Sequence, residues 1–136
     1  MVAVIGEAST RVEDKKFLTG VGKYLDDLEF PNVCHAIFLR SPHAHAQILS
    51  LNTVRAKEMP GILDIITADD VEQGKLNALK PFIQKNPNTG EAFSFSEQPL
   101  LAQKVVRDPG EPVVLIIAET VDLALNASEC IEIDYS

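Results

Sequence analysis

The sequence predicts an α+β domain, and two adjoining segments late in the chain carry that prediction. Residues 113–117 are five bulky, apolar and mostly β-branched residues in a row, with Gly110 and Pro112 in front of them. Such a run is typical of a strand that is covered on both faces and lies at the centre of a sheet. Residues 120–131 follow with a helical period, and the predicted helix face consists of Val121, Ala124, Leu125 and Ser128. The earlier part of the chain therefore has to fold back onto this strand and helix.

Composition limits the kind of partner this chain can have. The 136 residues fit one domain, and the net charge of -8 argues against binding to nucleic acid or to an anionic membrane surface. The longest apolar run is far shorter than the roughly 18 to 20 residues that a membrane span requires. Cys34 and Cys130 lie in apolar segments, so we expect both to be free thiols that behave as small hydrophobes. We therefore expect a reducing compartment and a cytoplasmic location.

The other elements follow from turn signals and apolar runs. Residues 1–16 are polar and predict an extended arm, and the glycine-rich turn at 19–22 predicts a short strand at 23–25. Further strands are expected at 33–39, 46–51, 62–67, 99–106 and 132–135. A short helix capped by Asn52 or Thr53 should run to about Met59, and residues 68–71 should form a single helical turn.

Three short segments are candidates for chemistry. The turn at residues 19–22 lacks the third glycine of a phosphate-binding loop, and Asp26 and Asp27 are interpreted as solvated turn carboxylates. His43 and His45 would face the same side of an extended segment, as zinc ligands could, but a third ligand is missing. The alternative is that these histidines satisfy backbone groups near the start of a strand. We assign no catalytic, cofactor-binding or metal-binding residue.

The turn in front of the central strand contains the acidic residue of greatest interest. Gly110, Glu111 and Pro112 form a structural turn, and the Glu111 carboxylate lies next to a buried run. A carboxylate near a core needs hydrogen-bond partners. We expect Glu111 to pair with Arg107, with Arg40 or with backbone donors.

The long irregular loop at residues 73–98 is the candidate functional segment. It has no period, it is interrupted by proline and glycine, and it exceeds what a simple connection requires. We expect weak order around residues 86–90. Phe93 and Phe95 are large apolar residues for such a loop. They either fold back on the core or dock on a neighbouring surface, where they would form part of a substrate-access loop.

Three sequence motifs together resemble a known family. They are RVED followed by FLTGVGKYLDD within residues 11–27, RSPHAHAQI at residues 40–48 and VRDPGEPV at residues 106–113. In this order they resemble the start of the large, molybdenum-binding subunit of the xanthine dehydrogenase, aldehyde oxidase and carbon monoxide dehydrogenase family. The resemblance spans nearly the whole chain. Val21, Lys23 and the pair Asp108 and Pro109 depart from the family pattern, and all of them lie in turns.

The resemblance implies an α/β-hammerhead with a mixed sheet and two main helices over residues 1–136, as a fragment of a longer subunit. It implies a structural and substrate-gating role in a molybdenum hydroxylase, which oxidises an aldehyde, a heterocycle or carbon monoxide with water-derived oxygen. Molybdopterin, in its cytosine dinucleotide form, would lie in the later domains of the subunit. The iron-sulfur and FAD subunits would be its partners, with [2Fe-2S] clusters and FAD. The fragment alone is expected to be inactive and to self-associate through apolar surface.

A second reading is a stand-alone module on the same fold that binds a small molecule or a partner. The length of the reading frame separates the two, since continuation for several hundred residues past Ser136 favours the subunit and a stop codon there favours the module.

Overall fold

The computed structural model describes residues 6, 11–28, 30–80, 85–94 and 98–136. The chain divides into two units, Met1–Asn32 and Val33–Ser136. That residues 1–136 form one domain, with an N-terminal arm at residues 1–16, stays a prediction.

The described part of the N-terminal unit contains two short helical segments joined by irregular chain, and none of its described residues forms a strand. Helix α1 (Asp14–Leu18) begins inside the stretch predicted to be an extended arm. The 3-10 helix η1 (Leu25–Asp27) replaces the strand predicted at residues 23–25, so that prediction is wrong. The physical reason is local: the Asp27 carboxylate accepts a hydrogen bond from the Tyr24 N–H at 2.8 Å, which favours a turn over an extended backbone.

The turn predicted at residues 19–22 is present and is packed against an aromatic ring. The backbone N–H groups of Val21 and Gly22 both donate to the carbonyl of Lys16, at 2.9 and 3.0 Å. The Phe17 ring stacks on Tyr24 with ring centroids 5.2 Å apart. A Cβ at Gly22 would collide with the Phe17 ring, so only glycine fits at this place without a shift of that ring.

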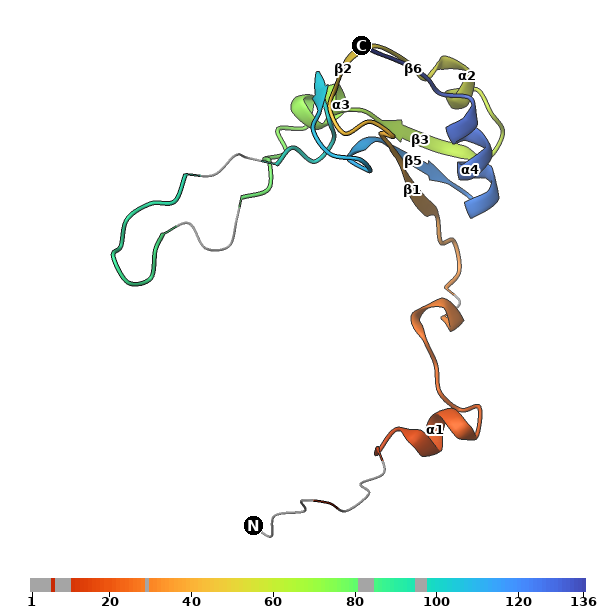
Figure 1. Cartoon of the computed structure of the whole chain (residues 1–136). Helices are drawn as coiled ribbons and strands as arrows, with labels where there is room; N and C mark the ends of the chain where they lie inside the picture. Colours follow the sequence, from red (N-terminus) through yellow and green to blue (C-terminus); the bar gives the residue numbers. More distant parts are fainter. Residues whose placement is uncertain (1–5, 7–10, 29, 81–84, 95–97) are drawn as a thin grey trace. The chain divides into compact units, whose positions relative to one another are not determined.

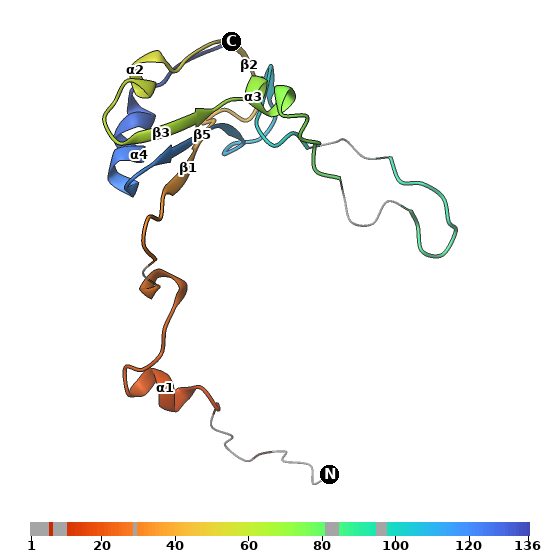
Figure 2. The same cartoon turned by 180° about the vertical axis from the view of Figure 1, so that it is seen from behind.

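The second unit contains a three-stranded antiparallel sheet with the predicted central strand in its middle (Figure 1). Strand β5 (Pro112–Ala118) lies between β1 (His35–Arg40) and β3 (Ile62–Ile66), and the same order is visible from behind (Figure 2). The inward-facing side chains Val114, Ile116 and Ala118 are each 0% exposed. The prediction of a sheet centre at residues 113–117 is therefore confirmed.

A second three-stranded sheet has β2 (Ala46–Asn52) at its centre, between β4 (Val105–Val106) and β6 (Glu132–Tyr135). All strand pairs in both sheets are antiparallel, so two small antiparallel sheets replace the single mixed sheet that was expected within the hammerhead. The strand predicted at residues 99–106 shrinks to its last two residues. Ahead of them the chain is irregular, and the Ala102 N–H donates to the carbonyl of Pro112 at 2.8 Å.

Helix α4 (Val121–Glu129) packs across β1 and β5 (Figure 1). Its start is fixed by Thr120, whose hydroxyl accepts a hydrogen bond from the Leu123 N–H at 3.2 Å. The helix is present as predicted, but its buried face is different. Ala124 and Ala127 are 0% exposed, because their small side chains let the helix approach the sheet closely, while Leu125 from the predicted face is 50% exposed.

The two shorter helices of this unit begin at side-chain hydrogen bonds. At the start of α2 (Val54–Lys57), the Asn52 side chain accepts from the Val54 N–H at 3.2 Å. At α3 (Ala68–Gln73), the hydroxyl and the N–H of Thr67 both donate to the Asp70 carboxylate at 2.7 Å. These bonds, the hydroxyl bond first, hold the pKa of Asp70 below its ordinary value.

The core lies between the first sheet, α4 and the second sheet. Its buried members are small and branched apolar residues: Ala46, Ala56, Ile65, Ala102, Val106, Val113, Val114, Ile116, Ala118, Ala124, Ala127 and Ile131. Both cysteines are free, and Cys34 is exposed, so the expectation that it packs as a small hydrophobe is wrong. It comes just before β1 begins at His35, outside the packed part of that strand. None of the described helices is long and apolar enough to cross a membrane.

Candidate functional site

Two of the sequence motifs, distant along the chain, meet at one end of the central strand. Strand β1 ends at Arg40 and strand β5 begins at Pro112, with a shift in strand register at this point. The Arg40 guanidinium donates to the carbonyl of Gly110 at 2.8 Å. The Ser41 N–H donates to the carbonyl of Glu111 at 2.9 Å, and the Gly110 N–H donates to the carbonyl of Ser41 at 2.7 Å. We call these two segments, residues 40–45 and 107–112, the paired turns.

The residue types in the paired turns explain their shape. Pro42 has no N–H and ends the pairing of β1, and the Ser41 hydroxyl accepts from the His43 N–H at 3.1 Å to form a local turn. Ser41 is 2% exposed, and its polar groups are satisfied by these bonds. Gly110 has a φ of +86°, which a glycine adopts without steric cost.

The Glu111 carboxylate binds the backbone of its own turn. Its Oε2 atom accepts a hydrogen bond from the Arg107 N–H at 2.5 Å. Of the expected partners, the backbone donor is the one observed, whereas the Arg40 guanidinium binds the carbonyl of Gly110 instead. In this arrangement Glu111 closes the turn that delivers the chain into β5, which is a structural task.

The two histidines of the paired turns are not placed as metal ligands. The His43 ring lies against the Tyr135 ring, with centroids 4.7 Å apart and planes tilted by 59°. Within the described part of the chain, no group of three or more His, Cys, Asp or Glu side chains is placed to hold a metal ion. We therefore assign no metal chemistry to His43 and His45.

The loop at residues 73–98 is more regular than its sequence predicts. Leu79 and Gln98 pair with each other through two backbone hydrogen bonds of 2.8 and 3.1 Å, and Lys85 pairs with Ala92 in an isolated bridge. These pairings escape sequence analysis because neither end shows an alternating apolar pattern.

The turn around residues 86–90, for which weak order was expected, is closed by hydrogen bonds. The Gly90 N–H donates to the carbonyl of Asn86 at 2.8 Å, and the Asn86 side chain accepts from the Asn88 N–H at 2.9 Å. Phe93 is 46% exposed and does not join the core. Phe95 lies outside the described residues, so the structure places only one of the two phenylalanines of the predicted access loop.

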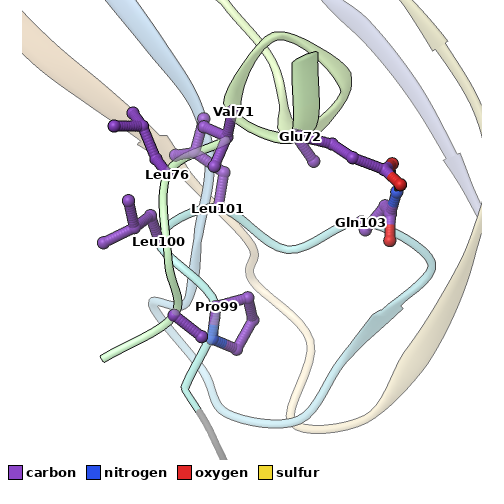
Figure 3. A pocket seen from close by; sticks show the side chains of 9 residues that line it. Val71, Glu72, Leu76, Pro99, Leu100, Leu101 and Gln103 are labelled. Carbon is purple, nitrogen blue, oxygen red and sulfur yellow. Dashed lines mark hydrogen bonds between the residues drawn. The ribbon is translucent and has the colours of Figure 1, made fainter. Parts of the chain in front are cut away.

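A small pocket lies where this loop leaves and rejoins the body, and sequence analysis did not find it (Figure 3). Apolar side chains of α3 and of residues 99–101 form its walls, and the Gln103 amide donates to the Glu72 carboxylate at 2.9 Å at its rim. Its volume of about 180 Å³ is below the roughly 300–1,000 Å³ of pockets that hold a cofactor or a drug-sized ligand. The lining residues are Ala68, Val71, Glu72, Leu76, Ala78, Pro99, Leu100, Leu101 and Gln103.

The two antiparallel sheets, helix α4 and the paired turns define an α/β-hammerhead domain. The family model for the a/b hammerhead domain of aldehyde oxidase and xanthine dehydrogenase matches residues 19–136, and the chain belongs to this family. Domains of this kind occur in the large subunits of molybdenum hydroxylases, so the resemblance found in the sequence is confirmed.

Particular relatives support the same assignment. The chain is 41% identical over 131 residues to the nicotine 6-hydroxylase large subunit of Paenarthrobacter nicotinovorans, a match that covers 96% of this chain and 15% of that protein. It is 35% identical over 125 residues to the carbon monoxide dehydrogenase large chain of Afipia carboxidovorans, covering 92% of this chain and 14% of the other. The crystal structure of quinoline 2-oxidoreductase from Pseudomonas putida 86 matches with a TM-score of 0.81 and 34% identity, over 97% of this chain and 16% of that one. The chain thus spans about a seventh of the length of the relatives it matches.

Proposed function

We propose that this chain is the N-terminal structural and substrate-gating domain of a molybdenum hydroxylase large subunit. The whole subunit would insert water-derived oxygen into an aldehyde or a heterocycle, or oxidise carbon monoxide. The observation that carries the proposal is the family match over residues 19–136. Relatives named for nicotine, quinoline and carbon monoxide chemistry support the range of substrates without selecting one of them.

The pocket at the base of the loop, with a volume of about 180 Å³, is too small for the cofactor that this function requires. Two larger hollows, of about 510 and 410 Å³, are lined mostly by exposed side chains around helix α1. We assign no residue of this chain to molybdopterin and derive no chemical step here. In the proposal, molybdopterin in its cytosine dinucleotide form belongs to the later domains, and [2Fe-2S] clusters and FAD belong to partner subunits in the cytoplasm.

The proposed activity predicts where molybdenum should be found. The purified 136-residue chain should have no oxidoreductase activity and retain no molybdenum, whereas the complete large subunit should contain it. Metal analysis by mass spectrometry checks both. Stoichiometric molybdenum in the 136-residue chain would show that cofactor-binding residues lie within it and would contradict the proposal.

The gating role rests on the loop at residues 73–98. Phe93 leaves nearly half of its surface in contact with water, which is unfavourable for an aromatic side chain by about 25 cal/mol for each Å² of apolar surface. A neighbouring surface in the complete subunit would cover this ring. We propose that the loop, with Phe93 and Phe95 as its contacts to that surface, borders the channel by which substrate reaches the active site.

Replacement of both phenylalanines with alanine in the complete enzyme tests this role. F93A/F95A should change KM or the preference among substrates severalfold while the molybdenum content stays the same. Phe38→Ala is a matched control, because Phe38 is 45% exposed on strand β1 and Phe93 is 46% exposed. Wild-type kcat and KM for the double variant across several substrates would mean that the loop is only a connector.

A further inference from the structure

We propose that residues 11–28 are a preformed docking segment, which binds the remaining part of the large subunit on the same polypeptide. The inference rests on the proposed function, because it takes the later domains of that subunit as the partner. It concerns the N-terminal unit by itself and does not depend on the loop at residues 73–98 or on the paired turns.

The docking segment exposes large apolar side chains at high density. Seven of them lie between residues 12 and 28, and the most exposed are Val12 at 97%, Leu18 at 87% and Leu25 at 81%. The structure describes the burial of most residues in this segment, and none of these residues is buried. Single exposed apolar residues are common on protein surfaces, but a concentration of them marks a site of contact with another surface.

The same segment has a specific local structure that it cannot stabilise by itself. Helix α1 has only five residues, and isolated helices shorter than about 12–15 residues are marginal in water. The fit of Gly22 against the Phe17 ring and the stack of Phe17 on Tyr24 nevertheless define one shape. A defined shape without buried residues indicates that the stabilising contacts come from another surface.

The relatives indicate which surface this is. The match to the nicotine 6-hydroxylase large subunit covers 131 of the 136 residues, so it leaves out five and includes most of the docking segment. That relative is much longer than the matched part, which is 15% of its length. A segment shared with long subunits, and rich in uncovered apolar side chains, fits a contact within such a subunit. Lys15, Lys16 and Lys23 are exposed in the segment and provide amines for chemical cross-linking.

Hydrogen exchange and cross-linking on the complete large subunit test the proposal. Amides of residues 11–28 should exchange at least tenfold more slowly than the same sequence in an unstructured peptide. L18S/L25S should remove most of that protection, and the control K15S/K23S, at exposed polar positions of the same segment, should keep it. Cross-links from Lys15 and Lys16 should reach residues of the same polypeptide beyond Ser136.

The outcomes separate this inference from the proposed function. Exchange at the rate of an unstructured peptide in a molybdenum-containing subunit would overturn the docking segment alone. Cross-links that reach only residues 33–136, a second copy of the chain or another subunit would overturn the choice of partner. A complete subunit that lacks molybdenum under conditions that supply it would overturn the proposed function, whatever the exchange rates are.

Discussion

Replacing Gly61 with alanine should destabilise the fold through two effects that can be separated. Gly61 has a φ of +79°, and a Cβ built there lies 2.5 Å from the Cδ1 atom of Leu123 on helix α4. A positive φ costs a non-glycine residue roughly 1–2 kcal/mol. A methyl group forced against a packed side chain typically costs about 1–3 kcal/mol more. We therefore expect G61A to lower the free energy of unfolding by about 2–5 kcal/mol.

Gly110→Ala isolates the first effect. Gly110 has a φ of +86°, but nothing lies within 4 Å of a Cβ built there. G110A should cost only about 1–2 kcal/mol. In a Leu123→Ala background the collision at Gly61 is removed, so G61A should cost less there than in the wild type. Urea unfolding followed by circular dichroism measures all four variants. Equal losses for G61A and G110A, or the same cost of G61A with and without Leu123, would refute the reasoning.

Two further substitutions test local bonds. T120A should lower the free energy of unfolding by about 0.5–2 kcal/mol, because the Thr120 hydroxyl caps α4. T53A is its control, since the Thr53 side chain makes no cap bond at α2, and equal losses would contradict the assignment. The lowered pKa of Asp70 means that its bonds from Thr67 stabilise the fold at neutral pH and are lost as the pH falls below about 4. The difference in urea midpoint between wild type and D70N should therefore shrink on acidification, and a difference that is constant with pH would be inconsistent with this bond.

Local patterns in the sequence predicted the strands well where the apolar run was uninterrupted. Strands β5 and β6 and helix α4 were found because each has a strong local signal. The strand predicted at residues 23–25 failed because the bond from the Tyr24 N–H to Asp27 outweighs the intrinsic preference of that segment. The division into two sheets could not be predicted, since the pairing of β2 with β6 depends on contacts between distant parts of the chain.

The candidate site was predictable in its parts but not in its assembly. The motifs at residues 40–48 and 106–113 were both recognised, and Glu111 was expected to bind nearby donors. Neither motif alone shows that the Arg40 guanidinium binds the carbonyl of Gly110, because that bond follows from the antiparallel register of β1 and β5. The pocket beside α3 could not be predicted, since its walls come from segments that are distant along the chain and meet only in the folded structure.

The pairing order of the strands also determines when each sheet can form during translation. Strands β1 and β3 both pair with β5, and β2 pairs with β4 and β6, so each sheet requires partners that leave the ribosome late. A nascent chain that ends before Pro112 exposes β1 and β3 with unpaired edges, which are prone to aggregation. Pairing across such sequence distances is also slow. The first half of the chain is therefore most prone to aggregation before β5 is available to pair with it.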